Sequence, residues 1–187
     1  MPSRSEADLD AEREQVEAAK KDPAAFQQLY DRYFDRVYSY VYYHCGNREQ
    51  AEDITAATFQ KGLEELPNFQ WRGIPYSAWL YRVAANQLSR ERRRPAWLEL
   101  QDSGHAADEA GQPEDMVVRL DQDVRLRQAI QSLPADQRQA ILLRFFAGMR
   151  NREVGRVMNR SEGAVKLLVF RAVANLRRVL ADEEDGE

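Results

Sequence analysis

The sequence predicts an all-α protein made of two small helical domains that are joined by an acidic, flexible linker. Apolar residues recur at three- and four-residue spacing along most of the chain, a pattern typical of helices that bury one face. No segment shows the strict apolar–polar alternation of a half-buried strand. The chain has 187 residues, which is enough for one domain of ordinary size or for two small ones.

The first domain is expected over residues 23–95, behind an acidic segment at residues 1–22. Asp22 is a favoured N-cap residue, and Pro23 suits the first position of a helix. The helix that follows carries one apolar stripe, and Gly46 can end it in a left-handed cap. The stripe consists of Phe26, Leu29, Tyr30, Tyr33, Phe34, Val37, Tyr40 and Val41.

Two further helices complete this domain. Asn47 can cap the second helix, with a glutamine three residues later as its capping-box partner, and Pro67 stops it. A loop with two aromatic residues, Phe69–Pro75, leads into a third helix from about Ser77 to Arg94. Trp79 is in register with the apolar residues of that helix, so we expect it in the core.

The linker is expected at residues 96–122, where low hydrophobicity and high charge favour disorder. The second domain then covers residues 123–181, and an acidic tail follows at residues 182–187. Proline and glycine divide this domain into four helices. The expected helices are Val124–Ser132, Asp136–Phe146, Asn151–Met158 and Ser161 to about Leu180.

Charges are sorted by sign along the chain. The formal net charge is −4, but the acidic residues gather in the first segment, the linker and the tail. Basic residues gather instead in Arg82–Arg94 and Arg138–Arg178. Net charge is a poor guide to partners when signs are segregated in this way, and the two basic stretches predict two surfaces that face nucleic acid.

Several classes of protein are not expected. Cys45 is the only cysteine, so an internal disulfide is impossible. The N-terminus lacks the apolar core of a signal peptide, and no run of about 18 apolar residues could span a membrane, so we expect a cytoplasmic protein without membrane insertion. His44 and His105 have no partners at metal-ligand spacing. Because no nucleophile–base pair or phosphate loop occurs either, we expect no enzyme, no cofactor and no small-molecule substrate.

The second domain contains a candidate helix-turn-helix. The short helix Asn151–Met158 is followed by a tight turn at Asn159 and by Ser161, a good cap for the next helix. Gly155 is the small residue that lets the two helices approach each other. Basic residues surround the motif, and they suit phosphate contacts, although a helical hairpin with a solvated basic face would show the same pattern. The basic residues around the motif are Arg150, Arg152, Arg156, Arg160, Lys166 and Arg171.

These motifs together resemble a known family. Leu133–Gly148, Ser161–Lys166 and the residues from Arg171 to Arg177 closely resemble the sigma-4 domain of extracytoplasmic-function sigma factors, a subfamily of the sigma-70 family. The first domain is similar to the sigma-2 domain of that family. The matching segments are Phe26–Tyr33, Ala51–Phe59 and Ala78–Asn86, so the resemblance covers about residues 23–95 and 124–180.

The resemblance implies roles for the first domain. One helix is expected to bind core RNA polymerase, through Glu52, Asp53, Thr58 and Phe59. A helix-dipole partner at Asp53 and a core aromatic at Phe59 are the simpler alternatives. The loop and the third helix are expected to open the minus-ten region of promoter DNA, with an extruded base stacked on Trp71 or Tyr76. Other expected DNA contacts there are Arg82, Asn86, Arg90, Arg93 and Arg94.

In the second domain the resemblance implies that the helix-turn-helix reads the minus-thirty-five element. The expected DNA contacts are Arg150, Arg160, Ser161, Lys166, Phe170 and Arg171. Leu167 and Leu168 depart from the family, which often has polar and basic residues there. The acidic linker resembles the segment that passes through the polymerase channel, although a solvated tether would look the same.

We therefore expect a sigma factor that binds core RNA polymerase and promoter DNA, with an anti-sigma factor as a further partner. Two alternatives remain. A sigma-like decoy or adaptor would keep the helical core and bind only an anti-sigma factor. An ordinary helix-turn-helix repressor would need neither the segment from Glu52 to Phe59 nor the basic pattern of Arg82–Arg94.

Overall fold

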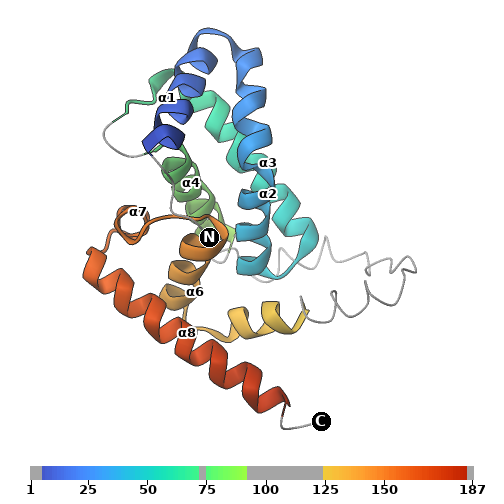
Figure 1. The fold of residues 1–187 in the computed structure, drawn as a ribbon. Coiled ribbons are helices and arrows are strands. Elements are labelled where there is room, and N and C mark those ends of the chain that lie inside the picture. Colours follow the sequence, from blue (N-terminus) through green and yellow to red (C-terminus); the bar gives the residue numbers. More distant parts are fainter. Residues whose placement is uncertain (1–5, 72–74, 92–123, 185–187) are drawn as a thin grey trace.

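In the computed structural model, which describes residues 6–71, 75–91 and 124–184, all regular secondary structure within those ranges is helical (Figure 1). The helices form two units. In the first unit, α2 packs on α3 and α4, and α1 lies across α2 and α4. Its helices are α1 (Glu6–Lys21), α2 (Phe26–Cys45), α3 (Arg48–Glu65) and α4 (Tyr76–Glu91), with 3₁₀ turns η1 (Pro23–Ala25) and η2 (Leu66–Asn68).

The helix boundaries of this unit follow from the capping residues. The Oδ1 of Asp22 accepts a hydrogen bond of 2.9 Å from the amide of Ala24. Gly46 has φ 80° and ends α2 in the left-handed region, which glycine adopts without strain. The Oδ1 of Asn47 accepts a bond of 2.8 Å from the amide of Gln50. The caps expected at Gly46 and Asn47 are therefore confirmed, whereas Asp22 caps the 3₁₀ turn η1 that leads into α2 and not α2 itself.

The segment at residues 1–22 contributes a helix to the first unit, whereas the sequence predicts only an acidic segment ahead of it. Val16 and Ala19 of α1 are buried in the common core. Glu12 is also fully buried, and its Oε1 accepts a hydrogen bond of 2.7 Å from the backbone amide of Ser77. Ser77 lies in the first turn of α4, where a carboxylate is stabilised by the free amides and the helix dipole.

The second unit begins with a helix at residues 124–132, as expected. The single helix expected over Asp136–Phe146 is instead split into α6 (Ala135–Ile141) and a π-helical segment, η4 (Leu142–Phe146). The helix-turn-helix follows as α7 (Asn151–Met158) and α8 (Glu162–Glu184), and α8 packs on both α6 and α7. In Figure 1, α8 is the long red helix at the outer side of this unit.

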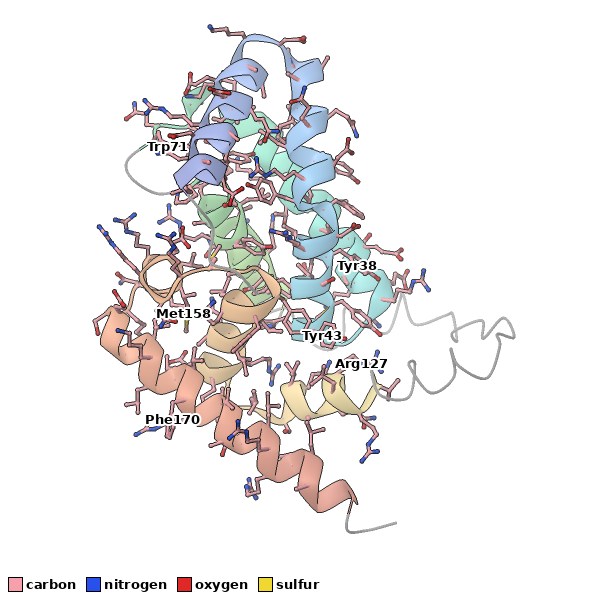
Figure 2. All side chains as sticks on the ribbon, in the orientation of Figure 1. Tyr38, Tyr43, Trp71, Arg127, Met158 and Phe170 are labelled. Carbon is pink, nitrogen blue, oxygen red and sulfur yellow. The ribbon has the colours of Figure 1, made fainter. Side chains whose placement is uncertain are left out.

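The two units contact each other at the C-terminal end of α2 and along α4. Tyr43 packs on Phe146 with ring centroids 4.5 Å apart. The guanidinium of Arg127 lies 5.2 Å from the ring of Tyr42, and Figure 2 shows Tyr43 and Arg127 at this junction. Helix α7 packs against α4, so the first helix of the helix-turn-helix lies beside the helix expected to contact the minus-ten region.

Candidate nucleic-acid and polymerase interfaces

The turn between α7 and α8 has the tight geometry of a helix-turn-helix. Asn159 adopts the left-handed conformation, with φ 53° and ψ 48°, which asparagine tolerates better than most residues. The amide of Arg160 then donates a bond of 2.8 Å to the carbonyl of Gly155. A Cβ on Gly155 would lie only 2.6 Å from the carbonyl oxygen of Arg160, so this close approach requires glycine. The hydroxyl of Ser161 accepts a bond of 3.2 Å from the amide of Ala164 and caps α8.

Helix α8 presents cationic side chains on its exposed surface. Lys166 and Arg171 are exposed, and the Nζ of Lys166 forms an ion pair of 3.1 Å with Glu162. Arg160, in the turn, forms an ion pair of 3.0 Å with Asp136. Exposed pairs of this kind contribute at most about 1 kcal/mol, so both cations can exchange their partner for a phosphate.

Two more of the expected DNA contacts are also exposed. Arg150 is exposed at the start of α7, where its amide donates a bond of 2.7 Å to Glu153. Phe170 is 73% exposed, and Figure 2 shows it on the outer side of α8. All six residues expected to contact the minus-thirty-five element are therefore exposed.

Helix α4 presents a second polar surface. Arg82, Asn86 and Arg90 are exposed, and their spacing of four residues places them on one side of the helix. Arg93 and Arg94 lie outside the described residues. One face of α4 thus offers donors for phosphates and for base edges.

The aromatic residues near this surface are arranged differently from the prediction. Tyr76 is fully buried, and burial, with a smaller contribution from the charge of Glu12, raises the pKa of its phenol. A buried ring cannot stack on an extruded base, so the prediction for Tyr76 is wrong. Trp71 is half-buried, and its ring centroid lies 6.2 Å from that of Phe69 in a T-shaped arrangement.

Trp79 lies at the surface of the core rather than within it. It is half-buried and lines a cleft of about 320 Å³ between the two units. Phe69 and Arg82 line the cleft from the first unit, and Arg156 and Val157 of α7 line it from the second. Helical periodicity cannot separate a core residue from one at the edge of the apolar face, and no other signal in the sequence identifies this cleft.

The helix expected to bind the polymerase divides into an exposed pair and a buried pair. Glu52 and Asp53 are exposed near the start of α3. Thr58 is buried, and its hydroxyl donates a bond of 2.7 Å to the carbonyl of Ile54. Phe59 is only 4% exposed, with its ring 4.8 Å from Tyr30. Thr58 and Phe59 therefore belong to the core, and of the four expected residues only Glu52 and Asp53 are exposed to a partner.

Among the residues that the structure describes, no helix is both long and apolar enough to cross a lipid bilayer. The same residues contain no cluster of three histidine, cysteine or carboxylate side chains with the arrangement of a metal site.

Comparison with known proteins gives matches to both units. The family model described as Sigma-70 region 2 matches residues 29–98, and the model described as Sigma-70, region 4 matches residues 123–176. The ECF RNA polymerase sigma factor BldN of Streptomyces coelicolor is 38% identical to this chain, and the match covers 96% of this chain and 70% of the relative.

Two solved structures have a similar fold. The structure of CnrH in complex with the cytosolic domain of CnrY matches with a TM-score of 0.71 at 23% identity, covering 92% of this chain and 98% of CnrH. The sigma factor RpoE in complex with the anti-sigma factor NepR from Bartonella quintana matches with a TM-score of 0.65 at 22% identity, covering 83% and 96% of the two chains. Both family models match, and the similarity to BldN extends over nearly the whole length of this chain. This chain therefore belongs to the extracytoplasmic-function subfamily of sigma-70 family RNA polymerase sigma factors.

Proposed function

We propose that this protein binds core RNA polymerase through the exposed carboxylates of α3 and holds promoter DNA on two surfaces, one on α4 and one on α8. As a sigma factor it directs core RNA polymerase to promoters, and it acts by binding rather than by catalysis. One observation carries the proposal: a single chain presents an exposed arginine–asparagine face on α4 and an exposed cationic helix in a helix-turn-helix.

The minus-thirty-five element is assigned to α8. The second helix of a helix-turn-helix enters the major groove, and its early residues reach base edges. Lys166 lies in the second turn of α8 and is proposed to contact a base edge. Arg171 lies about 140° further around the helix axis and is proposed to contact phosphate. Arg150, Arg160 and Ser161 are proposed to position the motif on the DNA backbone.

The minus-ten element is assigned to α4. Asparagine can pair with adenine through two hydrogen bonds, and arginine can hold phosphate or guanine, so Asn86 is the proposed base reader between Arg82 and Arg90. An unstacked base needs an aromatic surface. The half-buried rings of Trp71 and Trp79 can offer one, and the cleft beside Trp79 is lined by Arg82, which would face the phosphate of that nucleotide.

The remaining partner and the cellular compartment are also proposals. A similar fold has been solved as RpoE in complex with the anti-sigma factor NepR, which supports an anti-sigma factor as a partner of this chain. A factor that joins RNA polymerase acts where transcription occurs, so we propose that the protein works in the cytoplasm.

Run-off transcription with purified core polymerase tests the proposal. Core polymerase alone should give no specific transcript from a library of genomic promoter fragments, and addition of the protein should give discrete transcripts. A repressor would bind DNA without core polymerase and give no transcript. A decoy would not bind promoter DNA, and adding it to core polymerase would give no transcript.

Charge reversal at the polymerase surface sharpens the test. Asp53→Arg should prevent co-purification with core polymerase, because an exposed carboxylate is replaced by a cation. Glu14→Arg is the matched control, because Glu14 is exposed on α1, outside the proposed surface. Thermal melting of both variants should match the wild type. Normal polymerase binding by folded Asp53→Arg would contradict the assignment of α3.

A further inference from the structure

Helix α8 carries an exposed apolar stripe that the core does not use. Leu167 is 48% exposed and Phe170 is 73% exposed. Gly163 and Ala174 are also exposed, and the four residues follow one another at intervals of four, three and four. At about 100° per residue they fall within a band about 60° wide. The buried residues Val165 and Ala172 lie on the opposite side of the helix, so the stripe faces away from the protein.

Cations border the stripe on both sides. Lys166 and Arg171 lie about 70° to either side of its centre, measured around the helix axis. About three turns after Lys166, Arg177 lies on the same side of the stripe, and about two turns after Arg171, Arg178 lies on the other side. All four side chains are exposed. The two walls of a major groove are lined by phosphates, and its floor carries the base edges. A helix with cations on both borders and apolar side chains between them matches that arrangement.

The stripe also leaves room for close contact with bases. A Cβ at Gly163 would meet no atom within 4 Å, so the first turn of α8 has no bulk on this face. The 5-methyl group of thymine is the apolar feature that base edges present in the major groove, and apolar side chains contact it there. A solvated helix face has no need for two large apolar side chains, which remain exposed in the free protein.

We propose that Leu167 and Phe170 read thymine methyl groups in the minus-thirty-five element, so that this protein selects thymine there by apolar contact. The proposal rests on the proposed function, because it requires α8 to lie in the major groove. It assigns Leu167 a direct role in promoter specificity beside Lys166, which is proposed to contact a neighbouring base edge, while Arg171 holds phosphate on the other border of the stripe.

The test compares thymine with deoxyuridine, which lacks only the 5-methyl group. Holoenzyme made from the full-length chain and core polymerase first enriches a promoter from duplexes that are randomised upstream. Each thymine of the enriched minus-thirty-five element is then replaced singly by deoxyuridine. At one or more positions the affinity of wild-type holoenzyme should fall about fourfold, which corresponds to about 0.8 kcal/mol for one buried methyl group. Leu167→Ser and Phe170→Ala should each lose this response at a position of their own.

Two control variants remove exposed apolar groups elsewhere in the same unit. Phe145 is 48% exposed and Val124 is 37% exposed, and neither lies on α8. Phe145→Ala and Val124→Ser should keep the full response to deoxyuridine. All four variants change exposed positions, and thermal melting should confirm that they fold.

The outcomes separate the two levels of inference. If wild-type holoenzyme binds thymine and deoxyuridine equally at every position but still selects an upstream element, methyl reading is refuted and the sigma assignment stands. Methyl reading is also refuted, and the sigma assignment also stands, if Leu167→Ser and Phe170→Ala keep the wild-type response to deoxyuridine. The conclusion is the same if these variants weaken only the binding of an anti-sigma protein. If the holoenzyme selects no upstream element at all, the proposed function itself fails.

Discussion

Replacing Gly155 with alanine is expected to destabilise the helix-turn-helix. The new Cβ would lie 2.6 Å from the carbonyl oxygen of Arg160, whereas a relaxed contact between carbon and a carbonyl oxygen is about 3.3–3.6 Å. The turn would therefore have to move by roughly 0.7–1.0 Å. Overpacking of this kind costs about 1–3 kcal/mol, and the better helix propensity of alanine returns about 0.5–1 kcal/mol. At the middle of both ranges the net loss is about 1 kcal/mol.

Gly163→Ala provides a control, because the same chemical change is expected to raise the free energy of unfolding instead of lowering it. Its Cβ meets nothing within 4 Å, so alanine should stabilise α8 by about 0.5–1 kcal/mol. Urea unfolding followed by far-ultraviolet circular dichroism measures both variants. Trp79 lines the cleft beside Arg156 and Val157 of α7, so tryptophan fluorescence should report the destabilisation of Gly155→Ala as well. The reasoning is refuted if Gly155→Ala is as stable as the wild type, or if both glycine variants shift stability in the same direction.

Three further results are expected. Glu12→Gln should lower the free energy of unfolding by about 0.5–2 kcal/mol, because the charge that caps α4 is lost, and urea unfolding followed by tryptophan fluorescence would show it. Phe59→Ala should lower the free energy of unfolding by about 3–5 kcal/mol because the ring is in the core, whereas Asp53→Ala should lower it by no more than about 1 kcal/mol. Thermal melts and a polymerase pull-down measure both variants, and a fully stable Phe59→Ala would contradict the core assignment. Arg171→Ala should weaken binding evenly across DNA sequences and lower the slope of affinity against salt concentration by about one unit. Lys166→Ala should instead relax preference at one base position, where the binding free energy should fall by about 1–3 kcal/mol. Salt titrations on matched and scrambled elements measure both effects, and the same behaviour in the two variants would contradict the assignment.

Local sequence signals predicted the helix ends and the turn. Caps act within three or four residues of the chain, so Asn47, Gly46 and Ser161 could be placed from their neighbours alone. Gly155 could be identified in the same way, because a helix-turn-helix requires a small residue at a fixed position before the turn. These features depend on backbone geometry that is the same wherever the motif occurs.

Residues whose role depends on tertiary packing were harder to predict. Phe59 and Tyr76 lie in segments that match the family, yet burial decides that they support the fold instead of contacting a partner. Trp79 has the periodicity of a core residue and lies at the edge of a cleft. Helix α1 was missed because its acidic residues dominate the composition, although Val16 and Ala19 follow Glu12 at helical spacing and mark its buried face.

The contact between Glu12 and the start of α4 also constrains the order in which the chain can fold during synthesis. The two partners are 65 residues apart, and ribosomes add about 5–20 residues per second. Roughly 3–13 s therefore pass between the synthesis of Glu12 and that of its amide partner. Until then α1 can pack on α2 but not on α4, and a chain that stops before Ser77 cannot make the hydrogen bond to Glu12. The packing of the N-terminal helix would thus be completed only when α4, the helix that carries the proposed minus-ten surface, has been synthesised.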